Sequence, residues 1–522
     1  MKDEKSGNKQ GGLLRSTGVV SLFTMLSRVL GLTRDVVVAH VFGAGGGADA
    51  FFVAFKIPNF FRRLFAEGAF SQAFVPVLSE YRTQREHAEV RLLVSYTLGS
   101  LWGVLMVVTL LCVTFAPAVT FLFAPGFHDM PEKFGLASDM LRLTFPYLLL
   151  ISLTAMLGSV LNSYGRFAMP AFTPVLLNVC LITSALLVAP TMETPVMALA
   201  WGVLAAGVVQ LVFQFPFVKQ IDLLTPPRWG WADPGVKRIL KLMLPAMFGV
   251  SVAQINLLLD TVLASFLVDG SVSWLYYSDR LMELPLGVFG IAIATVILPS
   301  LSRKHASQSA EAFSQTLDWA VRMVLLVGVP AALALVVLAS PLLVTLFQYG
   351  EFSPNDVERA SLSLQAYGGG LVGFMLVKVL APGYFARQDT STPVKVGIKA
   401  MVTNMVFNLA LIVPLAHVGL ALATTLSAAV NAGMLWSGLR RDGVYKAQSG
   451  WWVFLLRLGL ASLLMVAVIL WLNKDLAQWL AWGWQQRCAY LALLVFAGAA
   501  AYFGALLASG MRLRDLVSRH GD

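Results

Sequence analysis

The sequence predicts an all-α polytopic membrane protein, and two observations support this fold class. Of its 522 residues, 57% are hydrophobic and only 13% are charged, which excludes a water-soluble globular domain of this length. Apolar runs of about 20 residues, the length that crosses a bilayer as a helix, recur down to the last few residues of the chain. We therefore expect about 14 transmembrane helices.

Each expected helix corresponds to one apolar run, and short polar breaks or breaks rich in glycine and proline separate the runs. In chain order, the approximate ranges are 17–41, 49–66, 92–124, 136–163, 169–190, 196–218, 239–268, 271–300, 316–347, 357–386, 394–415, 418–438, 452–473 and 484–510.

Lysine and arginine gather in alternate connections between these helices. One set contains basic groups such as Arg82, Arg85 and Arg91, whereas the other set is nearly free of them. By the positive-inside rule, the basic connections and both termini are cytoplasmic. The polar, glycine-rich residues 1–16 are expected to form a disordered cytoplasmic tail. Membrane topology thus accounts for the net charge of +10, so we expect no nucleic-acid partner.

Short sequence matches recur at a spacing of about 220 residues. This spacing is expected if the chain contains two consecutive repeats with the same membrane topology, as some transporters do. "VPVLSEY" near Pro76 resembles "LPSLSRK" near Pro299, and "TPV" occurs at both 173–175 and 392–394. Two six-helix lobes of equal topology should be related by a pseudo-two-fold axis along the membrane normal, with a cavity between them. The expected divisions are a tail at 1–16, an N-lobe at 17–218, a cytoplasmic linker at 219–238, a C-lobe at 239–438, and a final helix pair with a cytoplasmic end at 439–522.

Three expected helices, the first, second and eighth, carry ionisable residues within their apolar runs. Placing such a residue at the middle of a bilayer raises the free energy of helix insertion by about 2.5–3.5 kcal/mol, so its side chain normally faces a cavity or a partner. The first helix contains "SRVLGLTRD" at 27–35. Arg28 and Asp35 are seven residues apart and therefore share one face, whereas Arg34 lies about 120° away unless the helix bends at Gly31. The candidate substrate-binding residues are Arg28, Arg34, Asp35, Asp49, Lys56, Arg62, Arg280 and Glu283.

Arginine is the usual protein partner of phosphate, because its planar guanidinium donates two parallel hydrogen bonds. Arg28, Arg34 and Arg280 therefore favour an anionic cargo in a basic cavity. The alternatives are internal salt bridges that hold helices together and, for Arg62 near a helix end, a side chain that reaches the interface.

A second polar set indicates a coupling ion rather than cargo. Oxygen ligands around one carboxylate suit a hard cation such as Na⁺, or a proton-carrying site. For the asparagines and the threonine, the alternative is ordinary hydrogen bonding between helices. The set consists of Asp260, Asn404, Asn408 and Thr424.

No Walker A pattern, H-E-x-x-H or nucleophile elbow occurs in the sequence. We therefore expect a transporter without a bound cofactor, rather than an enzyme. An anion that leaves the cytoplasm gains about 2.3 kcal/mol per charge per 100 mV of inside-negative potential. An inward-moving Na⁺ or H⁺ could then reset the carrier.

At this point the sequence resembles the MurJ (MviN) lipid II flippases of bacteria, within the multidrug/oligosaccharidyl-lipid/polysaccharide exporter superfamily. The resemblance covers nearly the whole chain after the tail. It is carried by "SRVLGLTRD", by "DAFFVAFKIPNFFRRLFAEGAFSQAFVPVLSEY" from Asp49 and by "SVSWLYYSDRLMELPLGVFGIAIATVILPSLS" from Ser271. Motifs of this length are far more specific than a short pattern.

The resemblance implies two lobes plus a C-terminal helix pair that forms a groove for a lipid tail. It implies that undecaprenyl-diphosphate-linked disaccharide-pentapeptide moves from the inner to the outer leaflet of the cytoplasmic membrane by alternating access. The family's important charged residues match Arg28, Arg34, Asp49, Arg62 and Arg280, with Lys56, Asp35 and Glu283 as neighbours. Its sodium site has counterparts in the coupling-ion set above, although the chain has Asn408 where the family can have an acid.

Two other functions stay open at the level of sequence. A drug or metabolite antiporter of the same superfamily predicts a cavity rich in acids and aromatics, whereas the candidates here are mainly basic. A membrane scaffold that recruits cell-wall synthesis proteins would use the internal charges for structure alone. Lipid II, the phospholipid bilayer and such cell-wall proteins are therefore the expected partners.

Overall fold

The computed structural model describes residues 3–511, with the side chains of 3–17, 65–68, 246, 248–253, 291 and 294 excluded. Every regular element in this range is helical, as the sequence predicts. Ten helical stretches in the described part of the chain are long and apolar enough to cross a bilayer. The protein is thus an all-α, multi-pass membrane protein. The exact number of spans stays a prediction, and the basic residues Arg512, Arg514 and Arg519 lie outside the described range.

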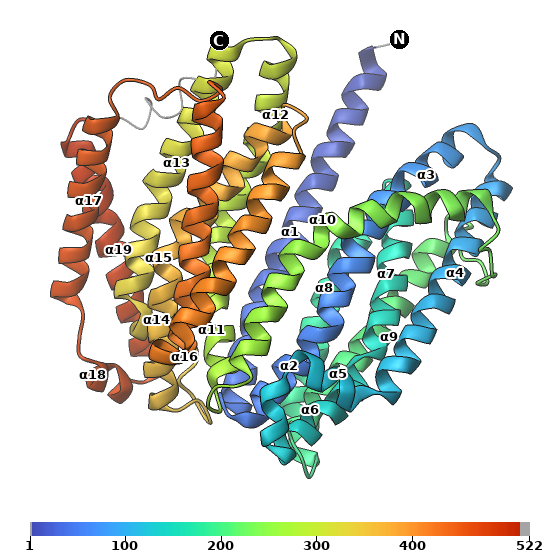
Figure 1. Ribbon diagram of the computed structural model, residues 1–522, viewed down its shortest axis with the longest axis horizontal. Coiled ribbons are helices and arrows are strands. Elements are labelled where there is room, and N and C mark those ends of the chain that lie inside the picture. Colours follow the sequence, from blue (N-terminus) through green and yellow to red (C-terminus); the bar gives the residue numbers. More distant parts are fainter. Residues whose placement is uncertain (1–2, 512–522) are drawn as a thin grey trace. The chain divides into compact units, whose positions relative to one another are not determined.

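The chain forms two compact units, Met1–Gly270 and Ser271–Asp522. In the first unit (Figure 1), the α-helices are α1 (Asp3–Phe42), α2 (Gly46–Arg62), α3 (Ser71–Gln84), α4 (His87–Thr114), α5 (Ala116–Phe123), α6 (Pro131–Thr144), α7 (Pro146–Ser163), α8 (Ala168–Thr183), α9 (Met197–Lys219) and α10 (Pro234–Ala264). Short π- or 3₁₀-helical segments accompany them: η1 (Arg63–Phe70), η2 (Pro125–Asp129), η3 (Ser184–Val188) and η4 (Ala189–Thr191).

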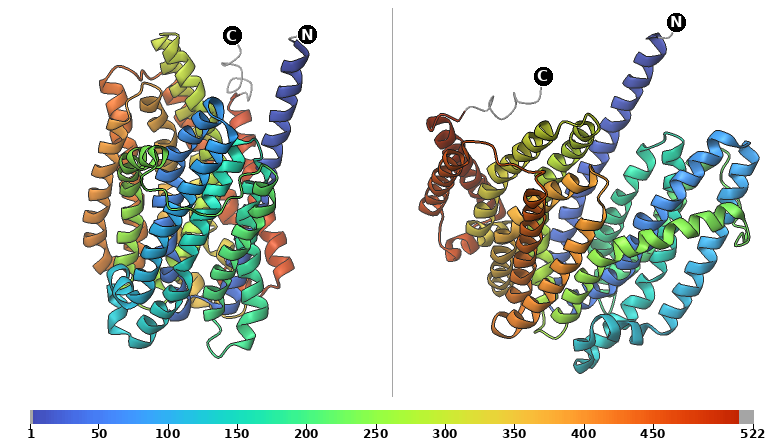
Figure 2. Two further views of the ribbon diagram at one scale, coloured as in Figure 1. Left: turned by 90° about the vertical axis from the view of Figure 1, so that its right-hand side faces the viewer. Right: turned by 45° about the horizontal axis from the view of Figure 1, so that its top comes forward.

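The second unit ends in a helix pair, α17 and α19, which pack side by side (Figure 2). Its elements are α11 (Ser271–Pro285), η5 (Leu286–Gly290), α12 (Ile291–Ala306), α13 (Ala310–Val337), α14 (Ala339–Leu346), α15 (Pro354–Phe385), α16 (Ser391–Arg441), α17 (Trp451–Leu472), α18 (Leu476–Ala481) and α19 (Trp484–Ala508).

The helix order repeats along the chain. The starts of α4, α5 and α6 at 87, 116 and 131 are matched by those of α13, α14 and α15 at 310, 339 and 354, a constant offset of 223 residues. A π-helical segment follows α2 as η1 and follows α11 as η5. The repeat of about 220 residues that the sequence predicts is therefore present in the helix order.

The label α16 covers two helices that meet at a kink at Ala416, where φ is 48° and ψ is −129°. The break that the sequence predicts between 394–415 and 418–438 is therefore confirmed. Two other details differ from expectation. Residues 3–16 are helical rather than disordered, because a helix formed over apolar residues lengthens without a new nucleation cost. The helix expected at 239–268 was assigned to the C-lobe, yet its counterpart α10 belongs to the first compact unit, where it packs on η1 and α3.

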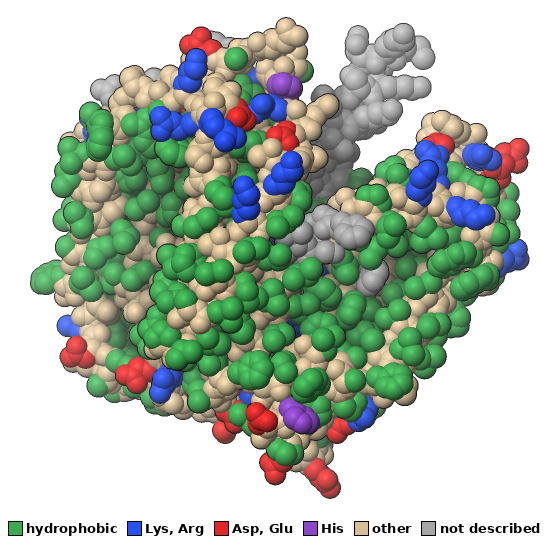
Figure 3. Space-filling view, in the orientation of Figure 1, with side chains coloured by type: hydrophobic (Ala, Val, Ile, Leu, Met, Phe, Trp, Pro, Cys, Tyr) green, Lys and Arg blue, Asp and Glu red, His purple; other side chains and the backbone are tan. Residues whose placement is uncertain are grey.

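Figure 3 shows one face of each unit. On that face, hydrophobic side chains cover the middle of the unit, and charged side chains gather toward the two ends of the unit. Large apolar residues such as Trp452 and Val413 are 85% and 88% exposed. Such exposure is expected of helix faces that contact lipid. In the first unit, one buried hydrophobic cluster lies where α3, α4 and α7 meet, and it includes Phe74, Leu78, Leu93, Met156 and Leu161.

Candidate functional site

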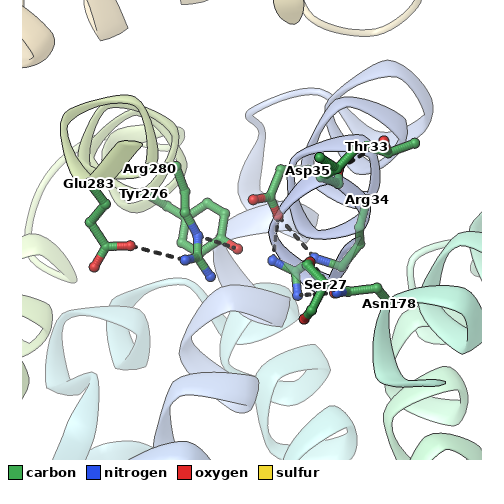
Figure 4. A network of polar contacts seen from close by, with 9 residues as sticks. Ser27, Thr33, Arg34, Asp35, Asn178, Tyr276, Arg280 and Glu283 are labelled. Atoms are coloured by element: carbon green, nitrogen blue, oxygen red, sulfur yellow. Dashed lines mark hydrogen bonds and ion pairs between the residues drawn. The ribbon is translucent and has the colours of Figure 1, made fainter. Parts of the chain in front are cut away.

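The charged residues of α1 fall into two different environments. Arg34 and Asp35 are both buried and form an ion pair, with Arg34 Nη2 2.6 Å from Asp35 Oδ1. Arg34 Nη1 also donates to Asn178 Oδ1 of α8 at 3.1 Å, and Asn178 Nδ2 donates to the Ser27 carbonyl at 3.0 Å. Figure 4 shows the Arg34 guanidinium directed at both partners. The pair and the amide together tie α1 to α8.

Arg28, seven residues before Asp35, is exposed and has no hydrogen-bond or ion-pair partner among the described residues. The two residues lie on one face of the continuous helix α1, but Asp35 is 3% exposed and pairs with Arg34. The helix runs unbroken through Gly31, so the Arg34–Asp35 pair forms without an interruption of α1 there. The Arg34 side chain is long enough to reach around the helix to the carboxylate of the next residue, Asp35.

Asp49, in the first turn of α2, is fully buried in an ion pair that sequence reasoning missed. Its Oδ2 accepts from Lys133 Nζ at 3.0 Å and from the Gly270 backbone N–H at 2.8 Å. Lys133 lies on α6 and also contacts Asp269 Oδ1 at 2.7 Å. The signal for Lys133 was present, since it is a rare lysine in the connections otherwise nearly free of basic residues.

Lys56 and Arg62 lie further along α2. Both side chains are partly buried, and Arg62 Nε donates to Asn59 Oδ1 at 3.0 Å, one turn earlier. The π-helical segment η1 starts at the next residue, Arg63. A π-helical turn redirects the side chains that follow it and is frequent at functional sites.

In the second unit, Arg280 and Glu283 form one short network on α11 (Figure 4). Arg280 Nε donates to Tyr276 Oη at 3.3 Å, and Arg280 Nη1 lies 3.1 Å from Glu283 Oε2. The guanidinium also lies over the Tyr276 ring, 5.2 Å from its centroid. Arg280 and Glu283 keep 38% and 48% of their side-chain surface exposed, so added ligands can reach both.

The structure thus brings the candidates together in three groups, on α1 with α8, on α2 with α6, and on α11. The first two belong to one compact unit and the third to the other. The predicted cavity between lobes stays a prediction.

The predicted coupling-ion residues divide between the units as well. Asn404 and Asn408 lie one turn apart on α16 and are fully buried, and Thr424, later on α16, donates its hydroxyl hydrogen to the Leu420 carbonyl at 3.0 Å. Asp260 lies on α10 of the first unit. The described residues contain no group of three or more His, Cys, Asp or Glu side chains that could hold a metal ion.

The chemistry available on α1 and α11 is anion binding. Guanidinium groups in otherwise apolar helices supply several N–H donors, and their neighbours Asp35 and Glu283 compensate part of the positive charge. A phosphate group that approaches Arg28 or Arg280 would gain charge-assisted hydrogen bonds in a region of low dielectric constant.

Comparison with known proteins gives a consistent result. The family model described as "Lipid II flippase MurJ" matches residues 38–484. The "Probable lipid II flippase MurJ" of Vibrio cholerae serotype O1 is 52% identical over 511 residues, which cover 97% of each chain. The "Lipid II flippase MurJ" of Burkholderia cenocepacia is 43% identical over 96% of this chain and 98% of its own length.

Solved structures agree with these sequence matches. A structure described as "Lipid II flippase MurJ, inward closed conformation" aligns with a TM-score of 0.80 and 26% identity, and it covers 95% of this chain and 99% of its own. An inward-facing multidrug resistance MATE family transporter of the MOP superfamily aligns with a TM-score of 0.62 at 16% identity, over 83% of this chain and 99% of its own. The second match shows a shared fold alone.

Proposed function

This chain belongs to the MurJ family of lipid II flippases, and from that premise we propose that it moves lipid II from the inner to the outer leaflet of the cytoplasmic membrane. The observation that carries the proposal is the 52% identity to a probable lipid II flippase over 97% of both chains. The chain is accordingly a transporter rather than an enzyme.

We propose that arginines bind the diphosphate of lipid II. Arg28 supports this role, because it is exposed in an apolar helix and no described residue pairs with it. Arg280 supports it as well, because its guanidinium is held by Tyr276 and Glu283 yet stays partly exposed. Arg34 is buried against Asp35, so it adds positive potential and holds α1 in place. Lys56 and Arg62 are the proposed further contacts. The neighbouring acids balance charge in the site: Asp35 pairs with Arg34, Glu283 with Arg280 and Asp49 with Lys133.

The proposed mechanism is alternating access. The two repeats have the same helix order, a design that lets one half move against the other around a central binding site. The diphosphate loses its hydration on entry, and the arginine N–H groups replace those hydrogen bonds. The polyprenyl tail is as apolar as lipid, so it has no need to enter a polar site.

Membrane potential is the proposed energy source, with Na⁺ or H⁺ as coupling ion. Each negative charge that leaves an inside-negative cytoplasm gains about 2.3 kcal/mol per 100 mV. Asn404, Asn408 and Thr424 of α16 offer oxygen ligands of the kind a hard cation takes, and Asp260 offers a carboxylate. Collapse of the potential and of the sodium gradient in separate experiments distinguishes the two energy sources.

The proposed location is the bacterial cytoplasmic membrane, with both termini in the cytoplasm. The connections rich in arginine support this orientation. Lipid II and the surrounding phospholipid bilayer are the proposed partners, along with cell-wall synthesis proteins. The test uses a variant whose three native cysteines are replaced, because Cys488 is exposed. A membrane-impermeant thiol reagent that labels an added cysteine at Lys474 from outside intact cells, and at Arg85 only after lysis, would support the orientation.

Complementation tests the function. Bacteria depleted of their own lipid II flippase should regain lipid II at the outer face when they express this chain, as measured with a lipid II-cleaving enzyme added outside spheroplasts. Arg28→Ala and Arg280→Ala should lose this signal at normal membrane levels, whereas Arg142→Ala, an exposed arginine on α6, should retain it. Failure of the unmodified chain to restore outer-face lipid II would refute the proposed function.

A further inference from the structure

Lys133 forms the centre of a charged network at the end of the first unit where α2 begins, in which Lys133 and Asp49 are buried and Asp269 is 56% exposed. Its side chain is 7% exposed, and its ammonium lies 3.0 Å from Asp49 Oδ2 and 2.7 Å from Asp269 Oδ1. The ammonium also lies 4.2 Å from the centroid of the Phe127 ring. One cation thus joins two carboxylates from segments more than 200 residues apart, the first turn of α2 and the segment that follows α10.

The segment 265–270 is fixed at further points. Asp49 Oδ2 accepts from the backbone N–H of Gly270, which has a left-handed φ of 94° that only glycine adopts readily. Ser265 Oγ accepts from the Gly126 N–H at 3.1 Å, close to the start of α6. The next residue, Ser271, begins α11, the helix that carries Arg280.

The second unit has a polar contact at the equivalent place. Lys133 is the third residue of α6, and Asp49 is the fourth residue of α2. Asp356 is the third residue of α15, which begins 223 residues after α6, and Trp274 is the fourth residue of α11. Trp274 Nε1 donates to Asp356 Oδ1 at 2.8 Å. Both repeats thus join the same two helix starts by a polar contact, although the residue types differ.

We infer that Lys133 is a positioning residue for translocation: through Asp49 and Asp269 it holds the start of α2 against the segment that leads into α11. This inference rests on the proposed flippase function. In this account Asp49 acts through its ion pair rather than by direct contact with lipid II. Loss of Lys133 leaves a buried carboxylate without its cation, and breaking such a pair is far more costly than breaking an exposed one.

The test compares Lys133→Ala, Lys133→Met and Lys133→Arg in the full-length chain, reconstituted in vesicles. Arg142→Ala is the matched control, because Arg142 lies on the same helix in an exposed pair with Asp139. Lipid II affinity and translocation rate are measured separately. Hydrogen exchange of the peptide that contains Gly270 provides a readout independent of transport.

Lys133→Ala should slow translocation at least about tenfold and speed exchange at Gly270, with lipid II affinity within about twofold of the unmodified chain. Lys133→Met should behave like Lys133→Ala, whereas Lys133→Arg should keep a rate close to that of the unmodified chain. Should Lys133→Ala fail to reach the membrane, Lys133→Met and Lys133→Arg decide by the same measurements.

Three results would overturn the inference: unchanged Gly270 exchange, a translocation rate equal to that of the Arg142→Ala control, or a loss of lipid II affinity in proportion to rate. If the unmodified chain itself moves no lipid II, the proposed function fails, and the exchange experiment still decides whether Lys133 holds this segment.

Discussion

Arg34 is ion-paired with its own neighbour in the sequence, Asp35, and both side chains are almost completely buried. The pair uses Arg34 Nε and Nη2 on a single carboxylate oxygen and leaves Nη1 to Asn178 of α8. A buried charge pair of this kind contributes mainly through the cost of breaking it. Arg34 therefore has two roles in this account. It holds α1 to α8, and it contributes to the electrostatic potential that an approaching anion meets.

Asp35→Asn should destabilise the protein by about 3–5 kcal/mol, because it removes a buried negative charge that lies 2.6 Å from the Arg34 guanidinium. The measurement is unfolding in a detergent titration. Asp139→Asn serves as the control, since it removes one partner of an exposed pair on α6 and should change the free energy of unfolding by at most about 0.5 kcal/mol. Equal effects of the two substitutions would contradict this account.

Arg487→Met should loosen the C-terminal helix pair. The buried Arg487 guanidinium donates to four backbone carbonyls, two near the end of α18 and two at or just after the end of α14: those of Trp479, Leu480, Val344 and Gln348. Because hydrogen bonds from a charged donor contribute about 1.5–3 kcal/mol each, we expect a loss of at least about 3 kcal/mol. Lys474→Ala, on an exposed residue of the same region, should leave the unfolding curve unchanged.

Asp318→Ala should detach the connection between α16 and α17. Asp318 accepts from the Tyr445 hydroxyl, the Trp451 indole and Arg322 Nε, each at 2.8 Å. Its removal takes the carboxylate partner away from Arg322 and an acceptor away from the connection, so limited proteolysis should cut residues 442–450 faster. Tyr445→Phe removes one of these contacts and should have a smaller effect, about 1 kcal/mol. Equal proteolysis rates for the unmodified chain and Asp318→Ala would refute this prediction.

Gly99→Ala should displace the segment 225–231 from α4. This segment lies against a groove formed by Gly99 and Gly103, where the Arg228 N–H donates to the Ser95 carbonyl at 3.1 Å. A methyl group at Gly99 would overlap the Arg228 backbone, so we expect a loss of about 1–3 kcal/mol in thermal unfolding.

Gly135→Ala provides the comparison for this substitution. Gly135 lies within α6, and a methyl group there meets no atom within 4 Å. Alanine should be neutral or should stabilise the helix by about 0.5–1 kcal/mol. If Gly99→Ala behaves like Gly135→Ala, the segment does not depend on the groove.

The contact between α3 and α10 should depend on pH. Arg238 Nη1 lies 2.8 Å from Glu80 Oε1, and this hydrogen bond holds the pKa of the Glu80 carboxyl below its ordinary value. A carboxyl with a lowered folded-state pKa stabilises the fold above its unfolded pKa, and the effect is lost as pH falls through the folded value. The difference in unfolding temperature between the unmodified chain and Glu80→Gln should shrink below about pH 4. A constant difference from pH 7 to pH 3 would contradict this assignment.

Fold class and internal repeat could be predicted from sequence, because apolar runs of bilayer length and matching short motifs are local signals. The candidates on α1 and α11 could be found for the same reason, since an arginine inside an apolar run is conspicuous. Lys133 was missed because it lies in a polar connection, where a charge needs no explanation until its burial is known. The contact of Arg34 with Asn178 joins residues 144 positions apart in the sequence, which no periodicity reveals.

Helix boundaries were harder to predict. Hydropathy shows that a segment is apolar but not where its backbone changes geometry, so the π-helical η1 and η5 were not foreseen. The breaks between α4 and α5 and between α13 and α14 fall inside single apolar runs. The grouping of α10 with the first unit depends on tertiary packing, and the sequence repeat alone suggests the opposite.

The most direct measurement of the central claim is lipid II translocation in vesicles that contain the purified chain and no other protein. With a membrane potential imposed, labelled lipid II should reach the opposite leaflet in a time-dependent manner, and Arg28→Ala and Arg280→Ala should reduce the rate at least about tenfold with lower lipid II affinity. A rate in the unmodified vesicles equal to that in protein-free vesicles, or full activity of both arginine variants, would contradict the account.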